Sequence, residues 1–325
     1  MGKVSQFRPI ALVTDPRYLE HDTANSLHPE IPARLEVILK RLETSPLTPY
    51  LKKISPEKAE INRVLAVHDE EYLSSFEGTC VSGREFFGHP DNRLGYNSYE
   101  TALLAAGGCL NGVDILENDE FELVFCCIRP PGHHAEKAQA LGFCFINNVA
   151  VAAKYWKDVH GKKRILIIDW DAHHGNGIQE IFEHDPEVFY ISIHEHPTFS
   201  FPGTGYSNET GTGAGEGATL NIPLPPGSGD ETVLNALKGI VREAVEKFEP
   251  EAIIVAAGFD AHVMDDMSGL AYTTKLYGYL GTFMASWAER YCKGKVLSIL
   301  EGGYHLEALP ASVEAYLAGL SVFID

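Results

Sequence analysis

Aspartate and histidine recur in this 325-residue chain at spacings suited to binding a metal ion. Asp171 and His173 are two residues apart, so on an extended segment both side chains point to the same side and could reach one ion. Asp260 lies in a separate segment and could supply a third ligand. Three protein ligands leave one coordination position open, which distinguishes catalytic zinc from structural zinc held by four ligands. The pattern predicts one catalytic divalent ion, although a single histidine of this kind could also be a hydrogen-bonded core imidazole.

A tandem pair of histidines, His133 and His134, could move protons beside such a metal. Imidazole titrates near neutral pH, so one of the pair could take a proton from water and pass it to a leaving amine. Asp169 could orient one imidazole and Asn176 could contact the other, and this difference would leave one histidine more cationic than its neighbour. The alternative interpretation is two loop histidines that cap nearby backbone.

Tyr304 stands on a flexible Gly-Gly turn, between Gly303 and His305. A tyrosine hydroxyl held there could donate a hydrogen bond to a carbonyl oxygen that is becoming an oxyanion. The alternative is a half-buried aromatic side chain that serves only in packing.

The candidate residues follow apolar runs of strand length, and five such runs stand out: 123–128, 165–168, 188–193, 252–257 and 296–300. These runs show little polar alternation, which is typical of parallel strands covered on both faces. Helical patterns occupy 32–44, 147–160, 177–184, 231–248 and 272–292, and the glycine-rich stretch 203–217 is predicted to be a long loop. The repetition predicts an α/β fold, whose ligand crevice lies outside the carboxyl ends of the strands. The polar clusters should therefore meet at one edge of the sheet.

Composition excludes several function classes. Asp and Glu number 45 against 26 Lys and Arg, a net charge of −19, so direct nucleic-acid binding is not expected. The apolar runs are shorter than the ~18 residues of a membrane span, and the N-terminus lacks an apolar signal core. The six cysteines include no Cys-x-x-Cys pair. These features predict a reduced, cytoplasmic protein with one domain over residues 1–325 and no membrane partner, and they leave association into a homo-oligomer open.

Six segments together resemble the zinc-dependent histone deacetylase family, which includes bacterial histone deacetylase-like amidohydrolases and acetylpolyamine amidohydrolases. They are 129–134 (Arg-Pro-Pro-Gly-His-His), 142–148 (Gly-Phe-Cys-Phe-Ile-Asn-Asn), 169–175 (Asp-Trp-Asp-Ala-His-His-Gly), 201–205 (Phe-Pro-Gly-Thr-Gly), 257–260 (Ala-Gly-Phe-Asp) and 300–304 (Leu-Glu-Gly-Gly-Tyr). The likeness runs in order from 28–30 to Tyr304. It implies the arginase–deacetylase fold, a central parallel sheet of about eight strands with helices on both faces.

The resemblance also implies a role for each motif residue. The zinc ligands fall on Asp171, His173 and Asp260. The catalytic residues fall on His133, His134 and Tyr304, with Asp169 and Asn176 as partners of the histidines. The residues that bind substrate are Gly142, whose carbonyl accepts from the scissile amide, Phe143 and Phe201, which sandwich an aliphatic stem, and Met267, which lines the pocket.

Two further cation sites follow from the resemblance alone. A structural potassium ion would be bound by Asp169, Asp171, His173, Ser192 and the backbone of Ile193, and a second one by backbone around Phe182, Asp185 and Val188. The chain departs from the family pattern at Asn176, where many members have Asp, and over 262–266, where Asp-Pro-Leu is commoner. The rim loops 15–28 and 83–97 match poorly, and Asp91 within them is interpreted as a solvated loop acid rather than as an acid that holds a substrate backbone.

The activity implied is hydrolysis of an N-acyl amide to a carboxylate and a free amine. The favoured substrate is an ε-acyl-lysine on a protein or peptide, with an acetylated polyamine as the alternative, and the negative net charge would attract either. A two-metal ureohydrolase on the same fold would need further carboxylates, but the chain has Gly175 and His262 near the ligands. A non-catalytic acyl-lysine reader would be expected to lack a ligand or the tyrosine, and all are present.

Overall fold

Eight parallel strands form the centre of the molecule, which the computed structural model describes over residues 7–23 and 28–323. Their order is β2-β1-β5-β10-β9-β6-β7-β8. Their bounds are β1 Ile10–Val13, β2 Leu51–Ile54, β5 Leu123–Cys126, β6 Ile165–Asp169, β7 Val188–Glu195, β8 Thr219–Leu224, β9 Ala252–Ala257 and β10 Val296–Leu300. The five strands from β5 to β7 in this order are buried along their whole length, as expected of a parallel sheet with both faces covered. The predicted α/β fold with about eight parallel strands is confirmed.

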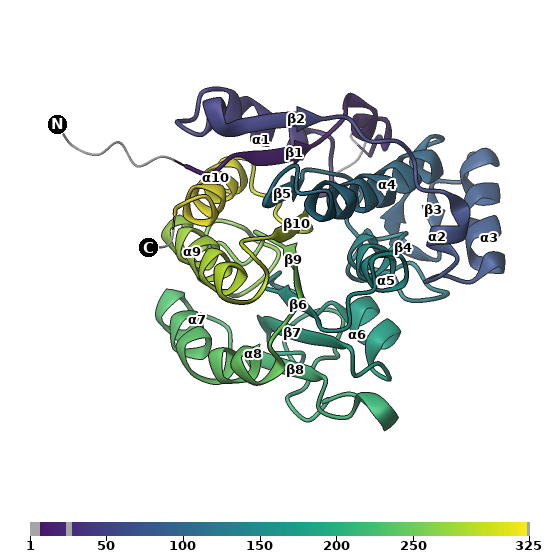
Figure 1. Ribbon diagram of the computed structural model, residues 1–325. Helices are drawn as coiled ribbons and strands as arrows, with labels where there is room; N and C mark the ends of the chain where they lie inside the picture. The colour runs from purple at the N-terminus through teal and green to yellow at the C-terminus, as the bar shows by residue number, and fades with distance from the viewer. Residues whose placement is uncertain (1–6, 24–27, 324–325) are drawn as a thin grey trace.

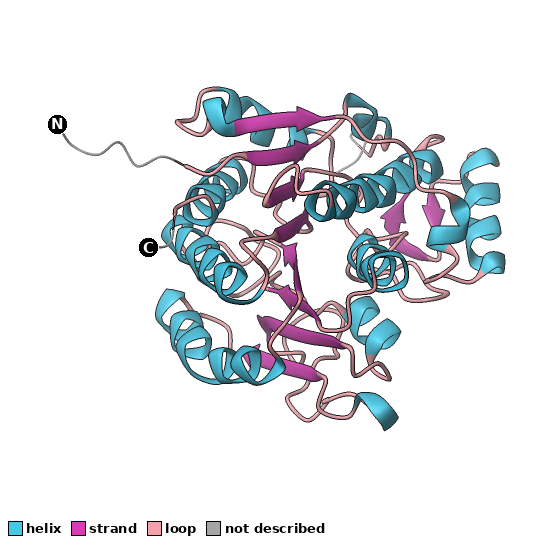
Figure 2. Cartoon of the chain, viewed as in Figure 1, coloured by secondary structure: helices cyan, strands magenta, loops and turns pink. Residues whose placement is uncertain are grey.

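Helices cover both faces of this sheet. In Figure 1, α7, α8, α9 and α10 lie on one side of the column of strands and α4, α5 and α6 lie on the other, and Figure 2 shows the same layers by type. The helix bounds are α1 Ala33–Glu43, α2 Ile61–Val64, α3 Glu70–Val81, α4 Ser98–Glu117, α5 Asn148–His160, α6 Asn176–Phe182, α7 Asp230–Ala236, α8 Arg242–Phe248, α9 Thr274–Tyr291 and α10 Ala308–Leu320. An antiparallel pair, β3 (Phe86–Phe87) and β4 (His89–Arg93), lies outside the main sheet.

The sequence patterns predict five of the eight strands and miss β1, β2 and β8. β2 and β8 form the two edges of the sheet and are only partly buried, so neither contains a long apolar run. β1 is fully buried but only four residues long. β5 ends at Cys126, whereas the sequence pattern predicts a strand over 123–128.

The helical patterns are confirmed with one exception. The prediction of a single helix over 231–248 is wrong. A π-helical turn, Leu237–Val241, separates α7 from α8, and Gly239 within it has a non-helical φ of −102° and ψ of −109°. Hydrophobic periodicity also misses α4, since most of its residues are buried and it has no polar face to mark a period.

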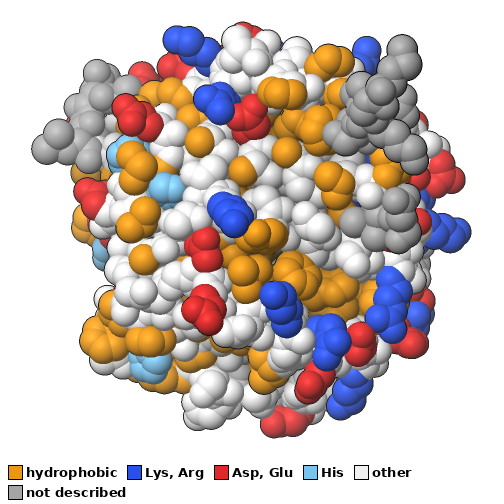
Figure 3. All heavy atoms as spheres, turned by 90° about the vertical axis from the view of Figure 1, so that its left-hand side faces the viewer, with side chains coloured by type: hydrophobic (Ala, Val, Ile, Leu, Met, Phe, Trp, Pro, Cys, Tyr) orange, Lys and Arg blue, Asp and Glu red, His pale blue; other side chains and the backbone are white. Residues whose placement is uncertain are grey.

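Two features of the structure concern the expectation of no membrane partner and no nucleic-acid partner. Within residues 7–23 and 28–323, no helix combines the length and the apolar character of a membrane span. On the face seen in Figure 3, which carries the helices at the left of Figure 1, Lys and Arg side chains lie among Asp and Glu side chains and form no continuous basic surface. The six cysteines are buried and unpaired.

Candidate active site

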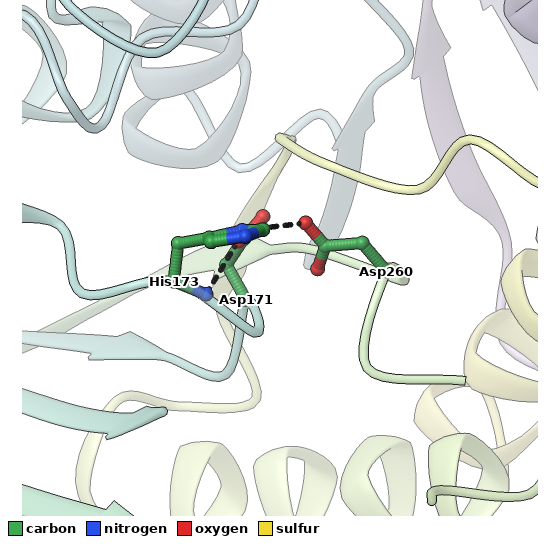
Figure 4. Close-up of side chains that lie close together, drawn as sticks. All are labelled: Asp171, His173 and Asp260. Carbon is green, nitrogen blue, oxygen red and sulfur yellow. Dashed lines mark hydrogen bonds and ion pairs between the residues drawn. The ribbon is translucent and has the colours of Figure 1, made fainter. Parts of the chain in front are cut away.

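Two adjacent strands bring the three candidate metal ligands together. β6 pairs with β9, and Asp171 and His173 follow the first strand while Asp260 follows the second. Figure 4 shows the three side chains pointing toward one another. The Nδ1 atom of His173 lies 3.2 Å from Oδ1 of Asp171 and 3.0 Å from Oδ2 of Asp260. Among the described residues, these form the one group of His, Cys, Asp or Glu side chains arranged to hold a metal ion.

Backbone groups fix each ligand. Oδ2 of Asp171 accepts from the N–H of Gly302 at 2.8 Å, and Oδ1 of Asp260 accepts from the N–H of Ala172 at 2.9 Å. Nε2 of His173 donates to the carbonyl of Met267 at 3.1 Å, which leaves Nδ1 free to bind a cation. Gly302 is required by this close approach, since a Cβ there would lie 2.5 Å from Oδ2 of Asp171.

The electrostatics of this group favour a cation. Burial disfavours a charged His173, but the carboxylates of Asp260 and Asp171 outweigh burial and raise the pKa of His173 well above its usual value. Two carboxylates and an imidazole that are all buried suit a divalent metal such as zinc.

The tandem histidines lie beside this group and have different partners. Nδ1 of His133 donates to Oδ2 of Asp169 at 3.1 Å, and Nδ1 of His134 lies 2.8 Å from Oδ1 of Asn176. The amide of Asn176 is oriented by Glu136, whose Oε1 accepts from Nδ2 of Asn176 at 2.7 Å. Oδ1 of Asn176 is therefore the acceptor and His134 the donor, which leaves the lone pair of His134 on Nε2.

These partners separate the proton affinities of the two imidazoles. Burial disfavours a charged His133, but Asp171 and Asp169 reverse that effect and raise the pKa of His133 to about 10. Burial, together with the positive charges of His133 and His173, holds the pKa of His134 well below its usual value. The expectation that one histidine is more cationic than the other therefore agrees with this geometry, with His133 as the cationic member.

A narrow pocket of about 140 Å³ leads to these residues. Its lining comprises Asp91, His134, Gly142, Phe143, His173, Phe201, Met267 and Tyr304. The rings of Phe143 and Tyr304 meet edge to face with their centroids 5.8 Å apart, and those of His134 and Phe201 do so at 4.9 Å. The structure thus brings all four residues expected to bind substrate to one pocket. Asp91, interpreted from the sequence as a solvated loop acid, is exposed but lies in β4 and lines the same pocket.

Phe143 is held in an unusual backbone conformation. Its φ of +69° lies in the left-handed region, which is costly for a side chain of this size. Its N–H donates to Oδ1 of Asn92 at 2.9 Å, which anchors it across 51 residues of chain. The residue before it must be glycine, because a Cβ on Gly142 would lie 2.2 Å from the imidazole of His134.

Asp265 holds the segment that carries Tyr304. Its Oδ2 accepts from the N–H groups of Tyr304 and His305 at 2.6 and 2.8 Å. From the other side, Nε of Arg34 donates to the carbonyl of Gly303 at 2.6 Å, and its guanidinium lies 4.8 Å from the centre of the tyrosine ring. Burial raises the pKa of Tyr304 well above its usual value, so the hydroxyl keeps its proton. The sequence singled out 262–266 only as a departure from a family pattern.

The residues of the two expected potassium sites lie in or next to β6, α6 and β7. Ser192 pairs in register with Asp169 on the neighbouring strand, and its hydroxyl bonds to Nδ1 of His194 at 2.7 Å. The carbonyls of Phe182 and Asp185 accept from the N–H groups of Asp185 and Val188. Both sites stay predictions.

Comparisons of the sequence with known proteins agree with the family predicted from the motifs. Residues 28–320 match the family model of the histone deacetylase domain. The chain belongs to the histone deacetylase family. It is 39% identical over 317 residues to a probable deacetylase of Archaeoglobus fulgidus, a match that covers 96% of this chain and 86% of that protein. It is 35% identical over 294 residues to the histone deacetylase-like amidohydrolase of Pseudomonas aeruginosa, covering 90% of this chain and 77% of that one.

A comparison with solved structures agrees with the predicted fold. The crystal structure of the HDA15 HD domain matches with a TM-score of 0.91 at 35% sequence identity, over 96% of this chain and 88% of that one. The family predicted from the six motifs and its arginase–deacetylase fold are therefore confirmed.

The metal group generates a first prediction. We expect one divalent transition-metal ion per chain, because Asp171, His173 and Asp260 form the one suitable group among the residues described. Asp260→Ala should lose most of this metal by elemental analysis after dialysis. Asp91→Ala, at the mouth of the same pocket, should retain it. Two transition-metal ions per chain in the wild type, or full transition-metal content in Asp260→Ala, would contradict this assignment.

Proposed function

We propose that this chain is a zinc-dependent amidohydrolase that removes an acyl group from the ε-amine of lysine on a protein or peptide. Membership of the histone deacetylase family and the names of its relatives support a deacetylase or amidohydrolase. The observation that carries the finer proposal is the pocket of about 140 Å³, whose lining includes Phe143 and Phe201 together with His134 and the candidate metal ligand His173.

The walls of the pocket suit a linear aliphatic stem that ends in an amide. Phe143 and Phe201 offer ring surfaces to the methylene groups, and burial of those groups favours binding by about 0.8 kcal/mol for each CH₂. The backbone carbonyl of Gly142, between His134 and Phe143, would accept from the N–H of the scissile amide.

Asp171, His173 and Asp260 would hold the zinc ion, which supplies Lewis-acid polarisation of the acyl carbonyl and of a water molecule. His134 acts on the proton: its Nε2 is free because Nδ1 donates to Asn176, and its depressed pKa keeps it neutral and able to accept a proton from water. The same atom then returns the proton to the leaving amine. Asp171 and Asp169 keep His133 cationic, and its positive charge would stabilise the developing oxyanion.

Tyr304 supplies a second group to that oxyanion. Its hydroxyl remains protonated, and the segment before it is held by Asp265 and Arg34, so the donor is oriented before substrate arrives. A donor of this kind stabilises the transition state more than the ground-state amide, because charge develops on the oxygen during the reaction.

Two alternatives share parts of this site. An acetylated polyamine also has a linear stem and a terminal amide, and the net charge of −19 favours both cationic substrates. A two-metal ureohydrolase is less well supported, because the described residues contain one metal-binding group. We propose in addition the two potassium sites implied by the family, a cytoplasmic location, which the six buried free cysteines favour, and no direct binding of nucleic acid.

The substrate class is tested by steady-state kinetics. We expect kcat/KM for an acetyl-lysine peptide to exceed that for acetylputrescine and acetylspermidine on the zinc-loaded protein. A preference for the polyamines would support the alternative substrate, and release of urea from a guanidino compound would support the ureohydrolase. Absence of hydrolysis of every acyl amide would reject the proposed activity itself.

Tyr304→Phe isolates the hydroxyl group. The ring remains, so zinc content and thermal stability should stay near wild type, whereas loss of one preorganised oxyanion donor lowers kcat by about 10²–10³-fold, or ~2.7–4 kcal/mol. KM should change less than kcat. Both constants should be measured on one acetyl-lysine peptide at matched zinc loading. A variant within about threefold of wild type would indicate that the hydroxyl is not used in the reaction.

Asn176 tests the role of His134 through the pH profile. A carboxylate at this position favours the imidazolium form, so its introduction should raise the pKa of His134. His134 must be neutral to accept a proton, and therefore the acid limb of kcat/KM should move to higher pH. Asn176→Asp should be combined with Glu136→Gln, because the carboxylate of Glu136 accepts from Asn176 in the wild type. The single variant Glu136→Gln is the control, and an unmoved acid limb in the double variant would exclude His134 as the group that sets it.

A further inference from the structure

Glu301 makes a set of contacts that the proposed reaction does not use. It follows β10, three residues before Tyr304, and is 0% exposed. Its Oε2 accepts two backbone hydrogen bonds, from the N–H of Gly132 at 2.7 Å and the N–H of His133 at 3.1 Å. Its Oε1 has no hydrogen-bond partner within the described part of the chain. A carboxylate buried with half of its acceptor capacity unused costs free energy, so packing alone explains it poorly.

We propose that Glu301 is a positioning residue that fixes the turn of the tandem histidines to the strand end of Tyr304 and presents a negative charge to the imidazole of His133. This inference rests on the proposed function, because Glu301 would act in the same hydrolysis. It acts through His133 and has no contact of its own with the substrate pocket.

The turn around Gly132 and His133 is held on several sides, and Glu301 supplies the contact on one of them. A Cβ on Gly132 would lie 2.5 Å from the backbone N of Asn148 and 2.8 Å from the carbonyl of Ile146, so the turn is pressed against the start of α5. The carbonyl of His133 accepts from the N–H groups of Gly177 and Ile178 in α6. Glu301 therefore supplies the acceptor for the N–H side of His133, while α6 supplies the donors for its carbonyl side.

The main chain of Glu301 is itself fixed. Its N–H donates to the carbonyl of Ala257 at 3.0 Å, and its carbonyl accepts from Nη2 of Arg34 at 2.5 Å. Arg34 also donates to the carbonyl of Gly303, so one guanidinium holds both ends of the segment between Glu301 and Tyr304. A displacement of Glu301 would thus reach His133 through its side chain and Tyr304 through its backbone.

The charge of Glu301 adds to this role. Burial raises the pKa of its carboxyl to about 7, against the opposing influence of cationic His133 and of the two N–H donors. The ionised carboxylate, which predominates above this pKa, accepts more strongly from the two N–H groups and stabilises the positive charge of His133. Both effects are lost as the pH falls through the pKa. The groups that face it are His133 on the turn, Asp169 on β6, Cys109 on α4, Cys144 after the pocket glycine, and Arg34 on α1 through the backbone.

Two substitutions separate the acceptor from the charge. Glu301→Gln keeps an oxygen that can accept from both N–H groups but removes the charge, and Glu301→Met keeps the length but removes both. Ser298→Ala is the matched control, because Ser298 is equally buried on the same strand and bonds to the hydroxyl of Tyr316 at 2.6 Å. All four proteins are compared as full chains at equal zinc content.

We expect kcat on an acetyl-lysine peptide to fall about tenfold in Glu301→Gln, the size of one weakened charge-assisted hydrogen bond. Glu301→Met should fall by ~10²-fold, as for a reacting group displaced by about 1 Å. KM should change little, since the pocket walls are intact. In Glu301→Gln the acid side of the pH profile should lose one ionisation near pH 7. Ser298→Ala should keep the wild-type kcat and pH profile.

Hydrogen exchange gives a readout independent of activity. The amides of Gly132 and His133 should be protected in wild type and in Ser298→Ala, and should exchange faster in Glu301→Met. Wild-type kcat and pH profile in Glu301→Gln would overturn the charge role, and unchanged exchange in Glu301→Met would overturn the hold on the turn. If Glu301→Met does not fold, hydrogen exchange is compared in Glu301→Gln, whose neutral acceptor is weaker and should let the amides of Gly132 and His133 exchange faster than in wild type. Unchanged exchange in that variant would then overturn the hold on the turn. A wild type that hydrolyses no acyl amide would count against the proposed function, whereas the exchange comparison would still decide the contact.

Discussion

Burial of negative charge at the carboxyl edge of the sheet is the constraint on which the rest of the site depends. Asp169, Asp171, Asp260 and Glu301 come from three adjacent strands, and none is more than 1% exposed. Ionised carboxylates are costly in such surroundings unless positive charge or hydrogen-bond donors meet them. The cationic His133 and the imidazole of His173 meet that need, and a divalent metal held by Asp171, His173 and Asp260 would meet it further. The chemistry of the site is thus a consequence of how this charge is compensated.

Backbone N–H groups supply much of the compensation, and they do so across segments. Gly302 donates to Asp171, Ala172 donates to Asp260, and Gly132 donates to Glu301. Each strand end therefore holds the carboxylate of another, and no ligand is positioned by its own strand alone. Such an arrangement costs little reorganisation when charge develops on a substrate, because the dipoles are already oriented. It also explains why residue 302 is glycine, because a Cβ there would lie 2.5 Å from the carboxylate oxygen of Asp171 that accepts from its N–H.

The sequence predicts the centre of this arrangement better than its supports. Asp171, His173 and Asp260 could be foreseen to meet, because the carboxyl ends of parallel strands share one edge and the ligands follow recognisable apolar runs. The sequence does not indicate Asn92, Glu136 or Asp265, because each is a common residue in a segment with no clear pattern and only its distant partner marks it. Asn92 bonds to Phe143 across 51 residues, a separation that no periodicity encodes. Edge strands were missed for the related reason that half-exposed residues leave no apolar run.

The arrangement of the pocket also bears on which substrate the protein selects. The pocket lined by Phe143 and Phe201 would contact only a methylene stem and an amide, which acyl-lysine and acetylated polyamines have in common. Discrimination must then come from the mouth, where Asp91 lies with its carboxylate 3.0 Å from Nδ1 of His89. A peptide would present backbone N–H groups at a fixed distance from its stem, whereas a polyamine would present an ammonium that can take many positions. A carboxylate at this place could accept from the N–H groups of a peptide or pair with the ammonium of a polyamine. Because the peptide donors lie at a fixed distance from the stem, only binding of a peptide would depend strictly on the length of that stem.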